Sequence, residues 1–248
     1  MTRSSNAPRR ERAPCAAVVI GASGGIGRAL ALALVAQSHS TSVHALSRQS
    51  VAVDGAEAGR IDLEDEASIQ AAADRIAQGP APTLFMIATG VLHGAFRPER
   101  AMRELSAEHL MRDYRTNAIG PALAAKHLAP LMPRDRPAVF AILSARVGSI
   151  GDNRLGGWHA YRASKAALNM LIQILSIELA RTHPQAVIVG LHPGTVDTAL
   201  SQPFQRGVPS ERLFTPEVSA AHLLKVIDGL TPADSGGVFA WDGSRIPA

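Results

Sequence analysis

A glycine-rich turn, set between a short apolar run and a long helical pattern, limits what this chain can fold into more than any other feature. The run at residues 16–20 contains two Val and one Ile and ends at Gly21. It is too short for a helix and is typical of a strand buried on both faces. From Ile26 to Leu34, apolar residues recur three and four positions apart, which lines one face of a helix. Residues 15–37 are therefore predicted to form strand, turn and helix.

The turn itself predicts an anion site. Glycines allow a tight backbone turn, let a diphosphate approach closely, and let the helix pack on the strand. The first N–H groups of the helix add free donors and a partial positive charge. A flexible turn without a ligand is the alternative, but a strand before and a helix after are the context in which such turns bind nucleotides. The residues expected to hold the phosphates are Gly21, Ser23, Gly25, Ile26 and Gly27.

Composition narrows the class of protein. A chain of 248 residues with one cysteine, Cys15, fits one domain without an internal disulfide, which favours a cytoplasmic, reducing compartment. The apolar run before Gly21 is too short for a secretory signal, and no run of about 18 strongly apolar residues predicts a membrane span. Lys and Arg exceed Asp and Glu by only 25 to 21, which argues against a nucleic-acid partner. Residues 1–13 are expected to be a disordered basic tail, and residues 14–248 one domain; the tail contains Arg3, Arg9, Arg10 and Arg12.

Short apolar runs alternate with helical patterns along the whole chain. This order predicts a single-domain α/β fold with a doubly wound, mostly parallel sheet of about seven strands flanked by helices, and a ligand at the carboxyl edge. Further strands are expected near residues 41–46, 60–63, 83–88, 138–144, 186–191 and 238–241. Further helices are expected near residues 64–78, 107–131, 160–183 and 217–230.

The end of the second predicted strand indicates which nucleotide binds. In dinucleotide folds an acid at this point favours NAD, whereas an arginine accommodates a 2′-phosphate. Leu46, Ser47 and Arg48 include no acid. NADP(H) is therefore the expected cofactor, with Arg48 as the phosphate partner; a plain surface arginine is the alternative.

Tyr161 and Lys165 are the candidate catalytic pair. They lie four positions apart in a predicted helix, so the phenol and the ammonium share one face. A neighbouring cation favours the phenolate and lowers the tyrosine pKa from about 10. Tyr161 can then donate a proton to a carbonyl oxygen, or accept one from an alcohol. Such pairs are common on surface helices, so the catalytic interpretation of this pair depends on the glycine turn upstream.

Three features together resemble the short-chain dehydrogenase/reductase family over about residues 15–241: the Gly-x-x-x-Gly-x-Gly spacing, Asn117, and the Tyr-x-x-x-Lys pair. Ile20 stands where the family often has Thr. The resemblance implies a Rossmann fold and metal-free hydride transfer between a nicotinamide cofactor and a small carbonyl or alcohol. It also implies a homodimer or homotetramer. His192 is one of nine histidines and could be considered as a metal ligand, but no cluster of His, Cys or acidic residues has the spacing of metal ligands.

The resemblance assigns further roles residue by residue. Lys165 would bind the nicotinamide ribose, and Asn117 would anchor a water chain that leads to Lys165. Asn117, Gly120 and Pro121 lie inside a predicted helix, where Gly and Pro cost about 1 and 3 kcal/mol, so a kink is expected there. Asp62 and Leu63 would meet the adenine ring, although Asp62 could instead cap the next helix. Gly90 would support the sheet beside the cofactor.

A Pro-Gly turn after the sixth predicted strand would wall the nicotinamide, as it does in the resembled family. The alternative is a plain turn at the end of a strand. The residues concerned are Pro193, Gly194, Thr195, Val196 and Thr198.

The family's catalytic serine is the place where the pattern departs. Counting back from Gly148 places it at Ala145, which cannot donate a hydrogen bond. Ser144, immediately before, is expected to substitute if the strand end twists, because adjacent strand residues point to opposite faces. Ser149 is a second candidate.

Two functions follow. The residues 149–158 resemble a subgroup of the family that includes the carbonyl reductase sniffer and the bacterial C-factor signalling proteins. A polar segment at 199–214 without periodicity is predicted to be a mobile lid whose Phe204, Arg206 and Phe214 choose the substrate. An NADPH-dependent carbonyl reductase is the leading interpretation. An NADP(H)-binding sensor or signalling protein with little turnover is the alternative, motivated by Ala145.

Overall fold

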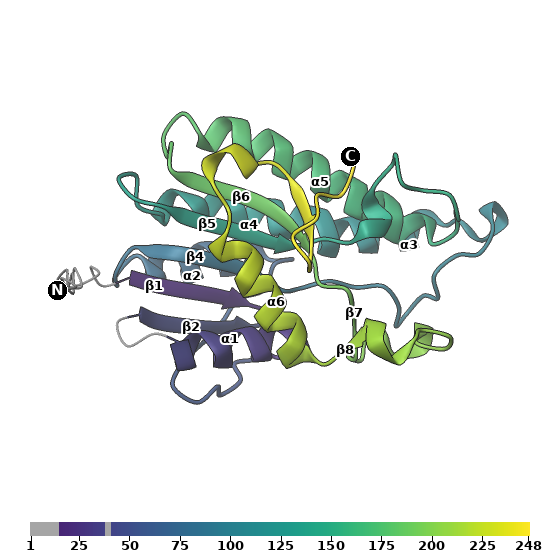
Figure 1. Ribbon diagram of the computed structural model, residues 1–248, viewed down its shortest axis with the longest axis horizontal. Coiled ribbons are helices and arrows are strands. Elements are labelled where there is room, and N and C mark those ends of the chain that lie inside the picture. Colours follow the sequence, from purple (N-terminus) through teal and green to yellow (C-terminus); the bar gives the residue numbers. More distant parts are fainter. Residues whose placement is uncertain (1–14, 38–40) are drawn as a thin grey trace, which may run out of the picture.

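One seven-stranded parallel sheet organises the computed structural model, which describes residues 15–37 and 41–248 (Figure 1). The predicted tail at residues 1–13 and the predicted first domain residue, 14, lie outside the described residues. The strand order is β3-β2-β1-β4-β5-β6-β9. The strands are β1 (Cys15–Ile20), β2 (Thr41–Ser47), β3 (Glu57–Arg60), β4 (Pro82–Ile87), β5 (Ala138–Leu143), β6 (Ala186–His192) and β9 (Val238–Ala240). The predicted single-domain Rossmann fold is confirmed.

Helices cover both faces of this sheet. The helices are α1 (Gly25–Gln37), α2 (Glu66–Ile76), α3 (Ala107–Tyr114), α4 (Gly120–Leu128), α5 (His159–Leu179) and α6 (Pro216–Asp228). Helices α1 and α6 pack on one face, and α2, α4 and α5 on the other (Figure 1). The described part of the chain has no helix that is long and apolar enough to cross a membrane.

Alternation along the strands produces these two cores. On β1, Val18 and Ile20 face the core with α2, α4 and α5, whereas Val19 faces the core with α1 and α6. On β4, Phe85 joins the first core and Met86 the second. Because both faces of β1, β5 and β6 are buried, these strands are nearly continuous apolar runs, as is typical of parallel sheets.

The third strand lies earlier in the sequence than predicted. β3 ends at Arg60, which pairs with Ser47, the last residue of β2. Since β2 provides no further partner, Asp62 and Leu63 lie beyond the strand, at the carboxyl edge of the sheet. The earlier end of the strand thus puts them in the loop between β3 and α2.

The long helix predicted for 107–131 is interrupted. After α3, a π-helical turn spans Arg115–Ile119, α4 follows, and a 3₁₀ turn (Ala129–Leu131) ends the segment. Pro121, which lacks an N–H, lies in the first turn of α4. A Cβ on Gly120 would lie 2.9 Å from the Leu63 carbonyl oxygen, so only glycine fits there. The expected irregularity is therefore a π turn that contains Asn117.

Other boundaries differ from the prediction by a few residues; α5, for example, ends at Leu179 and not near 183. The predicted lid contains two 3₁₀ turns, Gln202–Phe204 and Ser210–Arg212. It ends in β8 (Leu213–Phe214), which pairs with β7 (Thr195–Val196) as a separate two-stranded sheet.

Candidate active site

The glycine turn folds tightly at the end of β1. Gly21 has φ +95° and, with Ala22, donates its N–H to the Leu46 carbonyl on β2. A Cβ on Gly27 would lie 2.2 Å from the Gly21 carbonyl oxygen. Gly27 therefore allows α1 to pack on the turn, the role expected of a glycine at this position.

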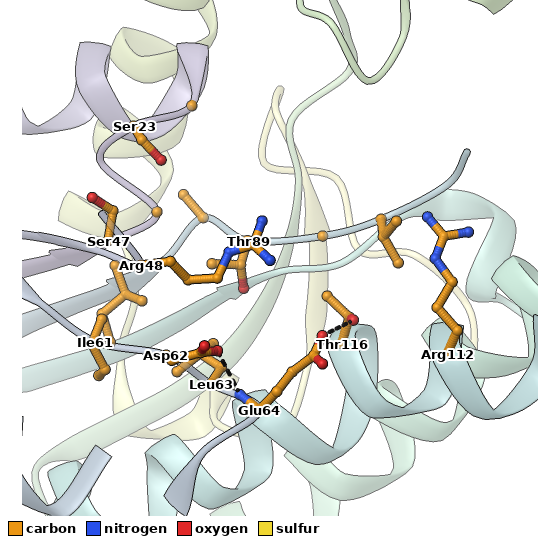
Figure 2. Close-up of a pocket in the computed structure, with 16 residues that line it drawn as sticks. Ser23, Ser47, Arg48, Ile61, Asp62, Leu63, Glu64, Thr89, Arg112 and Thr116 are labelled. Atoms are coloured by element: carbon orange, nitrogen blue, oxygen red, sulfur yellow. Dashed lines mark hydrogen bonds between the residues drawn. The ribbon is translucent and has the colours of Figure 1, made fainter. Parts of the chain in front are cut away.

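A cavity of about 400 Å³ opens beside this turn, at the carboxyl edge of β1, β2 and β4 (Figure 2). Ser47 and Arg48 border it from the end of β2, and the Arg48 side chain reaches across it above Asp62 (Figure 2). Of the predicted cofactor residues, those lining this cavity are Gly21, Ser23, Arg48, Asp62, Leu63 and Gly90.

Asp62 does not cap the next helix. The N-cap of α2 is Asp65, whose side chain accepts from Ala67 N. Asp62 Oδ1 instead accepts from Glu64 N at 3.1 Å, and its backbone N–H donates to Ser68 Oγ. The capping alternative for Asp62 is therefore wrong, and its carboxylate borders the cavity.

A second cavity, of about 270 Å³, continues from the first. The two share Gly24, Ala88, Thr89 and Gly90, so together they form an extended groove. Thr89 Oγ1 is buried in the groove wall and has no hydrogen-bond partner among the described residues. Predicted site residues lining this second cavity are Gly25, Ile26, Gly90, Ser144, Tyr161, Lys165, Pro193 and Thr198.

The groove fits a dinucleotide. Its first part lies at the strand ends where adenosine binds in Rossmann folds, and its second part contains the Tyr161–Lys165 pair. Where the two cavities meet, a Cβ on Gly25 would lie 3.0 Å from the Thr198 methyl group. Because glycine has no Cβ, the backbone N–H groups at the start of α1 stay accessible to a diphosphate.

Tyr161 and Lys165 are both buried on α5. Lys165 Nζ lies 5.9 Å from the centre of the Tyr161 ring and donates to the Leu143 carbonyl at 2.8 Å. Burial lowers the pKa of Lys165 to about 8, which the nearby Asp113 partly opposes. Burial, and then Asp113, raise the pKa of Tyr161. The expected lowering of the tyrosine pKa is therefore wrong, because desolvation dominates and the phenol stays protonated.

Asn117 fixes the wall of the groove. Its Oδ1 accepts from Val91 N at 2.8 Å, and its Nδ2 donates to the Val91 carbonyl at 2.9 Å. The same Nδ2 lies 3.1 Å from Ser164 Oγ on α5. A Cβ on Gly90 would lie 3.5 Å from Asn117 Oδ1 and 3.8 Å from Lys165 Nζ. Asn117 thus ties the loop after β4 to α5, the helix that contains Tyr161 and Lys165.

The serine position is divided between two neighbours. Ala145 is buried in an apolar cluster with Tyr161 and Leu92. Because alanine has no hydroxyl, position 145 offers Tyr161 no hydrogen-bonding neighbour. Ser144 lines the second cavity, and its Oγ donates to Asn169 Oδ1 at 2.6 Å. Ser149 is held by the Ala248 carbonyl and Asp152 N and does not line either cavity.

Aromatic side chains cover Tyr161 on its outer side. Trp158 has φ +50°, the one positive φ outside glycine in residues 15–37 and 41–248, and its ring centre lies 6.3 Å from that of Tyr161. The ring centre of Phe204, from the predicted lid, lies 5.0 Å from that of Trp158 and 5.8 Å from that of His93. Leu200 and Val147 pack on the same cluster. These side chains form an apolar cover, called here the aromatic roof: Trp158, Phe204, Leu200 and Val147.

The remaining residues of the Pro-Gly turn and the lid lie further away. Thr195 and Val196 form β7 and line neither cavity, and Gly194, with φ +79°, packs on Phe214. Phe214 contacts Trp241 and His222 instead of the roof. Arg206 is exposed and lines neither cavity.

Sequence reasoning missed several polar residues around the groove. Arg112 and Thr116 line the first cavity, and Thr116 Oγ1 donates to Glu64 Oε1 at 2.7 Å. Arg112 lies one turn before Thr116, and this i, i+4 spacing on a helix was the available signal. Across the described ranges, no group of three His, Cys, Asp or Glu side chains is arranged to hold a metal ion.

A doubly wound parallel sheet, a glycine turn after β1 and a Tyr–Lys pair at the carboxyl edge of the sheet define a nucleotide-dependent oxidoreductase. Residues 15–208 match the family model described as short chain dehydrogenase. The chain belongs to the short-chain dehydrogenase/reductase family and is an oxidoreductase of that family.

Relatives and solved structures agree with the predicted subgroup. C-signal of Myxococcus xanthus is 35% identical over 148 residues, which cover 59% of this chain and 83% of that protein. The NADPH-bound carbonyl reductase from chicken fatty liver superposes with a TM-score of 0.82 at 26% identity, over 96% of this chain and 100% of that one. The carbonyl reductase Sniffer of Drosophila melanogaster shares the fold, with a TM-score of 0.79 at 21% identity over 96% and 100% of the two chains.

Proposed function

We propose that this protein is an NADPH-dependent carbonyl reductase that also oxidises the corresponding alcohol, with Tyr161 as general acid and base. The observation that carries the proposal is the second cavity. There the glycine turn, the Pro193 wall and the Tyr161–Lys165 pair border one space. Reduction of a carbonyl needs a hydride donor and a proton donor on either side of the carbonyl group, and this space can hold both.

The nicotinamide cofactor, when bound, supplies the hydride. The chain's own residues supply the proton and the orientation. Tyr161 keeps its proton at neutral pH, because burial and Asp113 raise its pKa, and so it is ready to donate to a carbonyl oxygen. Lys165 would hold the ribose and, through its positive charge, stabilise the phenolate that remains. The aromatic roof would exclude water from the transfer.

Asn117 would anchor the proton path toward Lys165. Its amide is engaged with Val91 and Ser164, and the π turn in which it lies perturbs the regular backbone hydrogen bonds of the helix. A water that donates a hydrogen bond to a displaced carbonyl would pass protons to Lys165 after that side chain has given one up. The geometry of the turn supports this role.

NADP(H) is the proposed cofactor in preference to NAD(H). Arg48 is exposed at the cavity border, with Ser47 beside it, and no acid from the end of β2 would repel a 2′-phosphate. The chicken carbonyl reductase, which shares the fold at 26% identity, is described as NADPH-bound. Both observations support the phosphate-bearing cofactor.

Ser144 is proposed to take the part of the missing serine. Its hydroxyl lies in the wall of the second cavity and is oriented by Asn169. A substrate oxygen bound to Tyr161 would then receive a second hydrogen bond only if the Ser144 hydroxyl turns away from Asn169. Ala145 therefore favours a substrate whose reduction depends chiefly on one proton donor.

A sensor or signalling role is the second candidate. It is supported by Ala145 and by the likeness to C-signal. Retention of Asn117, Tyr161 and Lys165 in one connected site argues against it, because nucleotide binding alone does not require a buried proton donor.

Location and assembly also remain proposals. We infer a cytoplasmic protein, on the basis of its single cysteine. A homodimer or homotetramer is supported by exposed apolar side chains on α5, namely Met170, Ile174 and Ile177. Light scattering during size-exclusion chromatography measures the assembly directly.

The deciding experiment is a titration with NADPH and with NADH, followed by nucleotide fluorescence. A panel of aldehydes, ketones and quinones is then added to the complex that forms. Turnover of any carbonyl, with preference for NADPH, supports the reductase. Tight binding without turnover of any compound on the panel would transfer the assignment to the sensor.

A further inference from the structure

Three buried side chains beside the active site are left unused by the reaction as described: Glu99, His109 and Asp113. Their exposed fractions are 2%, 3% and 0%. Buried ionisable groups are costly unless they are paired. Their contacts lead from Asp113, on α3, to the first turn of α5, the helix that contains Tyr161 and Lys165.

Glu99 holds the first turn of α5. Its two carboxylate oxygens each lie 3.3 Å from Ala160 N, and its backbone carbonyl accepts from Trp158 N. A carboxylate at a helix N-terminus satisfies free N–H groups and interacts favourably with the helix dipole. Ala160 immediately precedes Tyr161, so Glu99 fixes the backbone from which the phenol projects.

His109 links Glu99 to Asp113. Its Nδ1 lies 3.0 Å from Glu99 Oε1, and its Nε2 lies 3.7 Å from Asp113 Oδ1. The ring stacks on Phe96, with ring centres 4.8 Å apart and planes 13° from parallel. The imidazole is thereby held in one plane between the two carboxyl groups.

Asp113 connects this chain electrostatically to the catalytic pair. Both of its carboxyl oxygens are buried without a hydrogen-bond partner among the described residues. Burial raises its pKa to about 6, so the group is mostly ionised at pH 7 and above. The charged or titratable groups facing it are His109 and Arg112 on α3, Glu99 on the preceding loop, and Tyr161 and Lys165 on α5.

We propose that Glu99, His109 and Asp113 form a buried positioning triad, which holds the first turn of α5 and places a negative charge near Tyr161 and Lys165. The inference rests on the proposed reductase function and deepens it. The charge of Asp113 favours the protonated phenol and the ammonium, the two forms required before a carbonyl is reduced. None of the three side chains lines the cofactor cavities, so they act through α5.

The first test is the pH profile of kcat/KM for carbonyl reduction by Asp113→Asn. Removing the charge weakens proton retention by both Tyr161 and Lys165, so the alkaline limb is expected to move to lower pH by on the order of one unit. Glu108→Gln is the matched control, because it removes an exposed carboxylate from the same helix. An alkaline limb in the same place for Asp113→Asn and its parent overturns the proposal.

A second test separates positioning from general stability. Glu99→Ala is expected to lower kcat by about tenfold to a hundredfold with an unchanged KM for NADPH, because the phenol is displaced. Glu99→Gln retains an oxygen for Ala160 N and should restore most of the rate. His109→Asn, which can still donate to Glu99, should exceed His109→Leu in kcat. Equal kcat for Glu99→Ala and Glu99→Gln, and for His109→Asn and His109→Leu, would contradict a positioning role and leave the triad with a role in stability alone.

A third test does not depend on turnover. The chain has two tyrosines, Tyr114 and Tyr161, so in a Tyr114→Phe background the ultraviolet absorbance of phenolate reports Tyr161 alone. Adding Asp113→Asn should move the onset of phenolate formation to lower pH, in both the free protein and the NADP⁺ complex. Asp113→Leu, which also removes the charge, replaces it if the amide variant does not fold. An unchanged onset rejects the triad even if the protein reduces no carbonyl, which would separately reject the reductase.

Discussion

Asn117 Nδ2 lies 3.1 Å from Ser164 Oγ, and this contact joins the π turn before α4 to α5, the helix that contains Tyr161 and Lys165. Ser164 Oγ in turn donates to the Tyr161 carbonyl at 2.8 Å. The tyrosine backbone is therefore tied to the same asparagine that holds Val91 in the groove wall. Three hydrogen bonds, from Val91 to Asn117, from Asn117 to Ser164 and from Ser164 to Tyr161, therefore link the groove wall to the proposed proton donor.

Tyr161→Phe removes the proposed proton donor and leaves the ring in place. The expected loss of kcat for carbonyl reduction is about 10²- to 10⁴-fold, the range that general acid catalysis contributes. The dissociation constant for NADPH, measured by fluorescence, should change by less than about threefold. Tyr114→Phe removes the other tyrosine and serves as the control. Undiminished turnover by Tyr161→Phe would contradict the catalytic assignment.

Ala145→Ser supplies the hydroxyl that the family has at this position. Because Ala145 packs on Tyr161, the added hydroxyl can reach an oxygen held by the phenol. An increase in kcat/KM on the order of tenfold is expected, about the value of one neutral hydrogen bond. Ser144→Ala should reduce the parent's rate by a similar factor. If neither variant differs from its parent, no serine hydroxyl assists the reaction.

Arg48→Asp tests the choice of nucleotide. A charge-assisted hydrogen bond contributes about 1.5–3 kcal/mol, so the variant should bind NADPH about 10- to 100-fold more weakly. The new carboxylate can accept from a ribose hydroxyl, so affinity for NADH should hold or rise. Arg103→Asp, exposed on a different loop, is the control. The same NADPH-to-NADH ratio before and after would exclude Arg48 as the phosphate partner.

Gly27→Ala tests the tight packing of α1 on the turn. Its Cβ would lie 2.2 Å from the Gly21 carbonyl oxygen, and relief requires movement of the backbone. A loss of about 1–3 kcal/mol in the free energy of unfolding is expected, together with weakened nucleotide binding. Gly79→Ala is the matched control, since its Cβ would have no neighbour closer than 3.6 Å. Urea unfolding compares the two variants, and equal stability would contradict the packing argument.

Lys165→Met tests the energetic cost of the buried ammonium. Because burial lowers the pKa of Lys165 from 10.5 to about 8, the folded state binds this proton more weakly than the unfolded chain does. The lysine therefore destabilises the protein fully below pH 8, and the effect fades as pH rises toward 10.5. The variant should be more stable at pH 7 by on the order of 2 kcal/mol, although inactive. A stability difference that stays constant from pH 7 to 10 would contradict this origin.

The fold and much of the site could be predicted because local patterns carry them. The glycine turn is defined by spacing and by the strand and helix beside it, and the Tyr161–Lys165 pair by a four-residue interval on a helix. Both features therefore required no knowledge of distant contacts. Their meeting in one cavity follows from the common carboxyl edge of parallel strands.

Other parts depend on long-range packing and could not be predicted in the same way. The end of β3 is set by the end of its partner β2, and nothing within residues 57–63 marks that point. The pKa of Tyr161 follows burial more than the neighbouring lysine. Glu99 meets His109 through a loop without periodicity, so the sequence does not indicate this contact. His109, Asp113 and Asn117 repeat at four-residue intervals, which is a local signal that they share one helix face.

The aromatic roof comes from segments that contribute nothing to the seven-stranded sheet. Trp158 lies at the end of the segment 149–158, directly before α5, and Phe204 lies in the segment between β7 and β8. Replacement of these two loops can therefore change which compounds are accepted while the nucleotide groove and the proton donor stay intact. Natural divergence and laboratory recombination can exchange them as separate modules, so that one catalytic scaffold acquires new substrates.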